Sequence, residues 1–312
     1  MADVKKIATR ESYGNALKDL AEEFPNLVVL DADLAGATKT GIFKKAYPDR
    51  HIDCGIAESN MMGIAAGLSL SGKIPFASSF AMFAAGRAFE QVRNSIGYPH
   101  LNVKIGATHA GLTVGEDGAS HQCNEDIALM RTIPGMVVMC PSDDIEAKAC
   151  VRAALEHVGP VYIRFGRAAV PVINDKPDYK FEIGKGQIVR EGKDVTIVAT
   201  GIMVDSAIQA AEKLAADGID AEVINICTIK PLDKDIIVNS AKKTGKVVTC
   251  EEHSVIGGLG SAVCDALAEE YPVKVKKIGM QDVFGESGSA SDLLKKYGLD
   301  GEGVYKQVKE FV

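Results

Sequence analysis

Short runs rich in β-branched residues alternate with longer amphipathic segments along most of the chain. This alternation is typical of α/β folds, in which helices cover the faces of a mainly parallel sheet. In the first half it predicts strands at residues 27–30, 74–78, 103–107, 136–139 and 161–164, and helices at 58–70, 84–96 and 144–156.

The alternation is interrupted at residues 168–191, where prolines, turn residues and mixed charges are typical of an interdomain connection. It resumes with predicted strands at 194–200, 221–226 and 247–250 and helices at 204–217 and after residue 260. The length of 312 residues also fits two cores better than one. We therefore expect an α/β protein with two parallel-sheet-based domains, residues 1–170 and 191–312, joined by a linker at 171–190.

The charge pattern argues against several classes of partner. The net charge is −7 and no cluster of lysine or arginine is present, so we expect no binding to nucleic acid or to an anionic membrane. No apolar run approaches the roughly 20 residues that span a bilayer, and the first residues lack an apolar signal core, so we expect a cytoplasmic protein. The seven cysteines show no CxxC spacing, which indicates buried small side chains.

A glycine run at residues 257–260 lies between a predicted strand and a predicted helix. The third glycine of a dinucleotide-binding fingerprint would fall at Val263, where a side chain blocks close packing. We therefore interpret the run as a tight turn before a helix.

Glu58 opens the long apolar helix predicted at 58–70. An acidic residue in the first turn is favoured by the helix dipole alone, whereas a desolvated carboxylate could share a proton with a ring nitrogen. Phe80 and Phe83 lie at a strand-to-helix junction. They fit a hydrophobic core or a stacking platform for a flat heterocycle.

The segment THAGLTVGEDGASHQ, residues 108–122, follows a predicted strand and carries a dense polar constellation. Loops at strand ends are where α/β sheets place their chemistry. His109, Glu116, Asp117 and His121 in a glycine frame are too polar a group for a simple turn. A metal site is the competing interpretation, but no second cluster completes its ligand set, so we expect no metal bound by this chain. A hydroxyl-rich substrate would match these donors and acceptors.

The motifs GIAESNM, SFAMF and HxxxxxGEDGxxHQ, in this order, resemble the transketolase family. The resemblance runs along the whole chain and includes ATR at 8–10, ADL at 32–34, PSD at 141–143 and EEHSVIGGLG at 251–260. In that family a further domain binds the diphosphate and Mg²⁺ through a GDG segment, which has no counterpart here. The resemblance therefore implies the C-terminal subunit of a split transketolase, with a thiamine-diphosphate pyrimidine-binding domain followed by a transketolase C-terminal domain.

The resemblance assigns the cofactor contacts. Glu58 matches the catalytic glutamate that contacts N1′ of the aminopyrimidine and promotes loss of the C2 proton. Phe80 and Phe83 match aromatic residues around the pyrimidine, and Asp33 matches an acid that orients the cofactor across a subunit interface. Gly86 stands where many relatives have tyrosine.

It also assigns the substrate contacts. The catalytic residues His109 and His121, together with Asp117, match residues that bind the carbonyl, hydroxyl and phosphate groups of the sugar. Arg10 and Arg167 match arginines that hold the sugar phosphate, a task suited to the guanidinium fork. A serine usual near this phosphate is Ala37 here, and Thr38 is adjacent.

The implied activity is transfer of a two-carbon ketol unit from a ketose phosphate to an aldose phosphate, as in the pentose phosphate pathway. It requires thiamine diphosphate and Mg²⁺, with the Mg²⁺ ligands supplied by an N-terminal transketolase subunit and the chain homodimerising within a heterotetramer. Three alternatives stay open: a 1-deoxy-xylulose-5-phosphate synthase-like subunit, a 2-oxoacid dehydrogenase β-like subunit, and a noncatalytic assembly partner.

Overall fold

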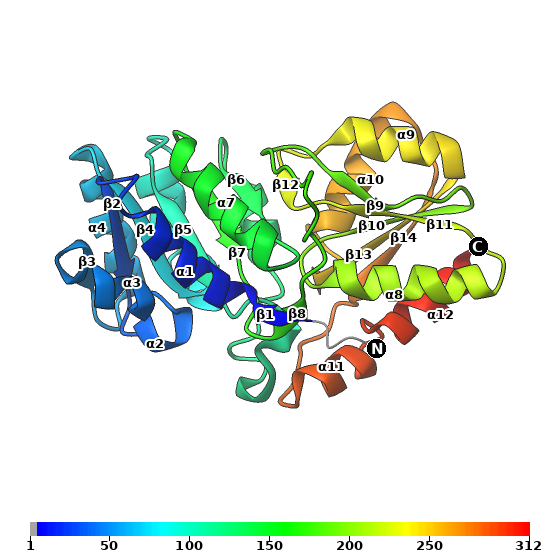
Figure 1. Cartoon of the computed structure of the whole chain (residues 1–312), viewed down its shortest axis with the longest axis horizontal. Coiled ribbons are helices and arrows are strands. Elements are labelled where there is room, and N and C mark those ends of the chain that lie inside the picture. The colour runs from blue at the N-terminus through cyan, green and yellow to red at the C-terminus, as the bar shows by residue number, and fades with distance from the viewer. Residues whose placement is uncertain (1–4) are drawn as a thin grey trace.

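The computed structural model describes residues 5–312, so the first four residues of the predicted first domain lie outside the described part. Figure 1 shows two α/β domains side by side, the first running from blue to green and the second from yellow-green to red. Each is built on a mostly parallel sheet, which confirms the predicted fold class.

The described residues of the first domain form most of a seven-stranded sheet in the order β12-β6-β7-β5-β4-β2-β3. Every pairing is parallel except that of β12, which comes from the second half of the chain and lies antiparallel to β6. The strands are β2 (Leu27–Asp31), β3 (His51–Asp53), β4 (Ile74–Phe80), β5 (Lys104–Thr108), β6 (Val137–Met139), β7 (Val161–Arg164) and β12 (Thr228–Lys230).

Helices cover both faces of this sheet, with α1 and α7 packed together on one of them (Figure 1). Predicted helices 58–70 and 144–156 correspond to α4 and α7. The helical elements are α1 (Thr9–Leu20), α2 (Ala35–Thr38), α3 (Gly41–Ala46), η1 (Pro48–Arg50), α4 (Glu58–Leu70), η2 (Met82–Arg87), α5 (Phe89–Gln91), η3 (Val92–Gly97), η4 (Leu112–Asp117), α6 (Asp126–Arg131) and α7 (Asp144–Glu156).

The prediction of one regular helix at 84–96 is wrong in detail. Two π-helical segments, η2 and η3, flank the short α5. The amide of Ala88 bonds the carbonyl of Phe83 and that of Tyr98 bonds Arg93, each five residues back. Such wide turns are frequent at functional sites and change the direction of the side chains that follow them.

The second sheet has the order β14-β13-β10-β11-β9, with β9 antiparallel at one edge. Strand β9 falls within the interval 171–190 that sequence patterns assign to the linker. The elements are β9 (Gln187–Arg190), β10 (Val195–Ala199), α8 (Met203–Ala216), β11 (Ala221–Asn225), α9 (Lys234–Thr244), β13 (Lys246–Ser254), α10 (Leu259–Glu270), β14 (Lys274–Met280), α11 (Ala290–Lys296) and α12 (Gly301–Phe311).

The two domains are packed against each other. A small pair, β1 (Lys6–Ala8) and β8 (Ala169–Pro171), lies between them in Figure 1. One hydrophobic cluster is continuous across the interface and joins Val138 and Cys140 to Val198, Ile226 and Ile229. Buried apolar surface contributes about 25 cal/mol per Å², so this shared core resists separation of the domains.

Gly257 and Gly258 end the predicted turn, and α10 begins at Leu259, within the glycine run. The buried Glu251 carboxylate accepts hydrogen bonds from the amides of Leu259 and Gly260 at 2.6 and 2.8 Å. A Cβ at Gly258 would lie 2.0 Å from a Glu251 oxygen, so only glycine fits there. Among the described helices, none has the length and apolar character needed to cross a membrane.

Candidate active site

Adjacent parallel strands bring the predicted residues to one edge of the first sheet. Strand β4 ends at Phe80 and its neighbour β5 ends at Thr108, which are register partners. Because parallel strands point the same way, their carboxyl ends meet at the same edge. His109 follows β5 directly and Phe83 follows β4 by three residues.

Four rings form an aromatic wall at this edge. The rings of Phe80 and His109 are stacked with centroids 3.9 Å apart, and those of Phe80 and Phe83 are stacked at 6.0 Å. His121 stands edge-on to Phe80 at 6.3 Å and to Phe83 at 5.4 Å. The structure therefore brings together four residues that the sequence places up to 41 positions apart.

Glu58 is the first residue of α4 and is only 2% exposed. Its Oε2 accepts a hydrogen bond from Nη1 of Arg87 at 3.1 Å. The Arg87 guanidinium in turn lies 4.8 Å from the ring centroid of Phe83, a cation–π contact. Arg87 thus connects the buried carboxylate to the aromatic wall.

Sequence reasoning did not identify Arg87. The i, i+3, i+7 spacing of Phe80, Phe83 and Arg87 was no guide, because Phe80 ends strand β4 and Arg87 ends the π-helical η2. The ion pair itself joins residues 29 positions apart and depends on how α4 packs beside η2.

Hydrogen bonds fix the tautomer of His109. Nη1 of Arg10 lies 2.8 Å from the carbonyl oxygen of Ala37 and 3.1 Å from Nε2 of His109. A guanidinium has no acceptor, so Nε2 accepts and the ring proton lies on Nδ1. Nδ1 then donates to Oγ1 of Thr108 at 2.9 Å.

His109 is held neutral in a strained conformation. Burial, with the nearby Arg10 and Arg167 guanidiniums, lowers the pKa of His109 to about 3. Its φ of 55° is left-handed and costs a non-glycine residue of the order of 1 kcal/mol. The ring can therefore offer hydrogen bonds at neutral pH but carries no positive charge.

Acid is expected to destabilise the folded chain partly through His109. In the unfolded chain its pKa is about 6.5, so the unfolded state binds this proton between pH 6.5 and 3 while the folded state does not. Within that window stability falls as pH falls, by up to about 1.4 kcal/mol per pH unit for one proton. Thermal melts from pH 7.5 to 4 should show a shallower decline for His109→Asn than for the wild type. Parallel declines would contradict the neutral assignment.

Arg167 lies beside the polar loop. Its Nη1 donates to the carbonyl of Val114 at 2.5 Å and to Glu116 Oε2 at 2.6 Å. The Glu116 side chain is 67% exposed, so this ion pair contributes little stability. Arg167 also lowers the pKa of Arg10, after the larger effect of burial. Two mutually repelling guanidiniums near one loop form a local cationic site in an acidic chain.

Two predicted residues stand apart from the rest. Asp33 and Asp117 are exposed, and within residues 5–312 no side-chain hydrogen bond or ion pair joins either to the aromatic wall or to Glu58. Asp33 has a φ of 60°, and its amide bonds Asp53 at 3.1 Å. Asp117 ends η4, immediately before a glycine with φ of 73°.

A buried polar network supports the loop of Asp33. Asp31 ends β2 and accepts hydrogen bonds from Thr40 at 2.7 Å and His51 at 3.1 Å. Burial opposes ionisation of Asp31, but bonds from His51 and Thr40 outweigh it and lower its pKa. Thr38 follows Ala37, the position at which the family usually has serine. Thr38 is buried, and its hydroxyl donates to the carbonyl oxygen of Leu34 at 3.0 Å.

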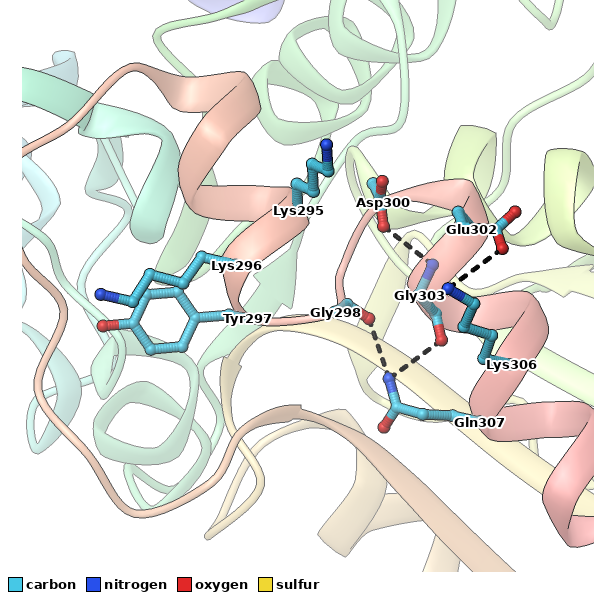
Figure 2. A pocket seen from close by; sticks show the side chains of 9 residues that line it. All are labelled: Lys295, Lys296, Tyr297, Gly298, Asp300, Glu302, Gly303, Lys306 and Gln307. Carbon is cyan, nitrogen blue, oxygen red and sulfur yellow. Dashed lines mark hydrogen bonds and ion pairs between the residues drawn. The ribbon is translucent and has the colours of Figure 1, made fainter.

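A separate hollow of about 750 Å³ lies between α11 and α12 in the second domain (Figure 2). Its Lys296 and Lys306 are paired with Glu286 and Glu302. Asp300 caps the amide of Gly303 at the start of α12. Because these charged groups already have partners, the hollow does not offer a cluster of polar side chains directed toward one point, as the edge of the first sheet does.

Among the described residues, no group of three or more His, Cys, Asp or Glu is placed to hold a metal ion.

Two family models cover most of the sequence. The transketolase pyrimidine binding domain matches residues 5–172, and the transketolase C-terminal domain matches residues 184–304. The chain belongs to the transketolase family. Its two domains are the pyrimidine-binding and C-terminal domains of that family, as the sequence motifs predicted.

The relatives include separate subunits. A Methanocaldococcus jannaschii protein described as a transketolase C-terminal section is 52% identical over 96% of this chain and 95% of its own length. A 6-deoxy-6-sulfo-D-fructose transketolase subunit from Clostridium sp. is 45% identical, covering 96% of this chain and 93% of its own. A solved structure described as a split gene transketolase, inactive beta4 tetramer, is 56% identical with a TM-score of 0.90, over 98% of both chains.

Proposed function

We propose that this chain is the cofactor-activating subunit of a two-subunit transketolase that uses thiamine diphosphate. The observation that carries the proposal is the buried Glu58 carboxylate, joined through Arg87 to the aromatic wall. A carboxylate beside stacked rings fits the aminopyrimidine of the cofactor, which needs a proton partner at N1′ and a flat contact surface.

Each residue of the site has a task in this proposal. When bound, thiamine diphosphate supplies the nucleophilic carbon that ketol transfer requires. Glu58 holds a proton at N1′, and Arg87 orients its carboxylate. Phe80 and Phe83 orient the ring and exclude water. Asp33 is assigned to the cofactor side of the site through the family resemblance alone.

The substrate is assigned to the two histidines of the aromatic wall and to the loop and arginines beside them. His109 and His121 are assigned to the carbonyl and hydroxyl groups of a sugar, and Asp117 is assigned to a hydroxyl group. Arg10 and Arg167 bind the phosphate, since the Arg167 guanidinium lies close enough to lower the pKa of Arg10. The Arg10 Nε is buried and has no hydrogen-bond partner among the described residues, so its N–H is available to donate to a phosphate oxygen.

Replacing Arg167 with alanine is expected to raise KM for ribose 5-phosphate by the equivalent of about 1.5 to 3 kcal/mol, the range for a hydrogen bond to a charged group. KM for unphosphorylated ribose should hardly change. Arg10→Ala should behave similarly, with an added loss because Arg10 also holds His109. Arg152→Ala, which removes only exposed ion pairs with Glu23 and Glu156, is the matched control. Equal losses for both acceptors would make the arginines structural.

We further propose that an N-terminal transketolase subunit binds the diphosphate and Mg²⁺, in a heterotetramer with two copies of each chain. Relatives named as a C-terminal section and as subunits support this division. Mouse and human transketolases align with this chain over 49% of their length. Co-purification from the native source followed by a ketol-transfer assay tests the proposal, and absence of transfer in the purified complex would contradict it.

The proposed donors are ketose phosphates of the pentose phosphate pathway. Relatives 45% and 40% identical are named for 6-deoxy-6-sulfo-D-fructose and apulose 4-phosphate, so the donor must be measured. The same assay with xylulose 5-phosphate and those two sugars decides it. A higher kcat/KM for either alternative would replace the proposed donor.

A further inference from the structure

A carboxylate of the second domain holds the loop that carries Asp117. Glu252 lies near the end of β13 and is 3% exposed. Its Oε1 accepts a hydrogen bond from the backbone amide of Thr113 at 2.5 Å, across the domain interface. A Cβ added at Gly111 would lie 2.4 Å from the carboxyl carbon of Glu252, so the loop is pressed against this side chain.

The same loop contacts the second domain at other points. Nε2 of Gln122 donates to the carbonyls of Leu112 at 3.0 Å and of Glu286 at 2.9 Å. A Cβ at Gly118 would lie 2.5 Å from Oγ of Ser287. Residues 111–122 therefore rest on a surface of the second domain, and Glu252 supplies the buried acceptor within it.

The second oxygen of Glu252 has a different neighbour. Oε2 lies 3.9 Å from Nη1 of the buried Arg164, whose Nη2 donates to the Glu252 carbonyl at 2.8 Å. Nε of Arg164 pairs with Asp126 at 2.9 Å. Burial raises the pKa of Glu252, against the effect of Arg164. The contact with Arg164 depends on the charge of Glu252, whereas the bond from Thr113 needs only an acceptor oxygen. Substitutions that remove one or both of these features can therefore test the two contacts separately.

We propose that Glu252 is a positioning residue for substrate binding, which acts by holding the Thr113 amide and thereby the loop bearing Asp117 and His121. This inference rests on the proposed transketolase function. It assigns the second domain a part in substrate binding, although Glu252 is too deeply buried to touch the substrate. Cofactor activation, which depends on Glu58, is independent of this contact.

The test compares Glu252→Ala with Glu252→Gln in the complex with the co-purified partner. Glu252→Ala should raise KM for xylulose 5-phosphate about tenfold, the effect of losing one hydrogen bond to a charged group. Hydrogen–deuterium exchange at cofactor C2 should stay at the wild-type rate. Glu252→Gln keeps an oxygen that accepts from Thr113, and its KM should stay within about twofold of wild type.

A second readout needs no activity. Amide hydrogen exchange of residues 109–122, followed by mass spectrometry on the chain, should accelerate in Glu252→Ala and stay slow in Glu252→Gln. Glu251→Ala is the matched control, because Glu251 is equally buried but bonds Leu259 and Gly260 of its own domain. It should lower the melting temperature and leave KM and loop exchange unchanged.

Three results would overturn the inference: an unchanged KM in Glu252→Ala, unchanged loop exchange in that variant, or an equal loss in Glu252→Gln. The last result would assign the effect to the ion pair with Arg164. If Glu252→Ala does not fold, Glu252→Asp replaces it as the test variant. Aspartate keeps the charge but is one methylene too short to reach the Thr113 amide, so it should show the same rise in KM. Absence of ketol transfer in the wild-type complex would instead contradict the proposed function, and the exchange measurement would still judge the role of Glu252.

Discussion

Replacing Glu58 with glutamine is expected to slow hydrogen–deuterium exchange at C2 of bound thiamine diphosphate about 10²- to 10⁴-fold, the range for loss of a positioned acid or base. Glutamine keeps the shape and can still accept from Arg87, but it cannot hold a proton for N1′ as an anion can. The measurement is C2 exchange in the reconstituted complex, beside a thermal melt of each variant.

A helix-dipole role would have a different signature. An acid in the first turn contributes about 0.3 to 1 kcal/mol of stability through the macrodipole and would leave exchange intact. Asp235→Asn is the matched control, because Asp235 also lies in the first turn of a helix but in the second domain. If Glu58→Gln shifts only the melt, as the control should, the assignment of Glu58 to cofactor activation is wrong.

The purified chain without its partner is expected to show no ketol transfer and to bind thiamine diphosphate at least about a thousandfold more weakly than the complex. In the proposed assembly the partner holds the diphosphate through charge-assisted bonds of about 1.5 to 3 kcal/mol each, so two or three lost contacts account for this factor.

The measurement is calorimetric titration of thiamine diphosphate with Mg²⁺ into the chain, alone and mixed with the co-purified partner, alongside the transfer assay. The Glu58→Gln chain mixed with the same partner is a useful control, since it should bind the cofactor yet transfer poorly. Ketol transfer by the chain alone would contradict the two-subunit proposal. Tight cofactor binding by the chain alone would contradict the assignment of the diphosphate site to the partner.

Local patterns in the sequence were sufficient to predict much of this protein. Strands 27–30 and 161–164 and helices 58–70 and 144–156 follow from periodicity, because the faces that they bury repeat at short spacing. The rule that chemistry gathers at the carboxyl ends of parallel strands indicated Phe80 and His109, which the structure stacks at 3.9 Å.

Other features depend on contacts between distant segments, and only the fold decides them. Strand β12 joins the sheet of the other domain because its pairing with β6 is a long-range contact that no local pattern encodes. The neutral tautomer of His109 follows from Arg10, which lies 99 residues away. Glu58 accepts a hydrogen bond from Arg87. Glu252 accepts one from the Thr113 amide across a domain boundary, and these two residues are 139 positions apart in the sequence. Periodicity shows which face of an element is buried, but the partner of a buried polar group is set by packing between elements.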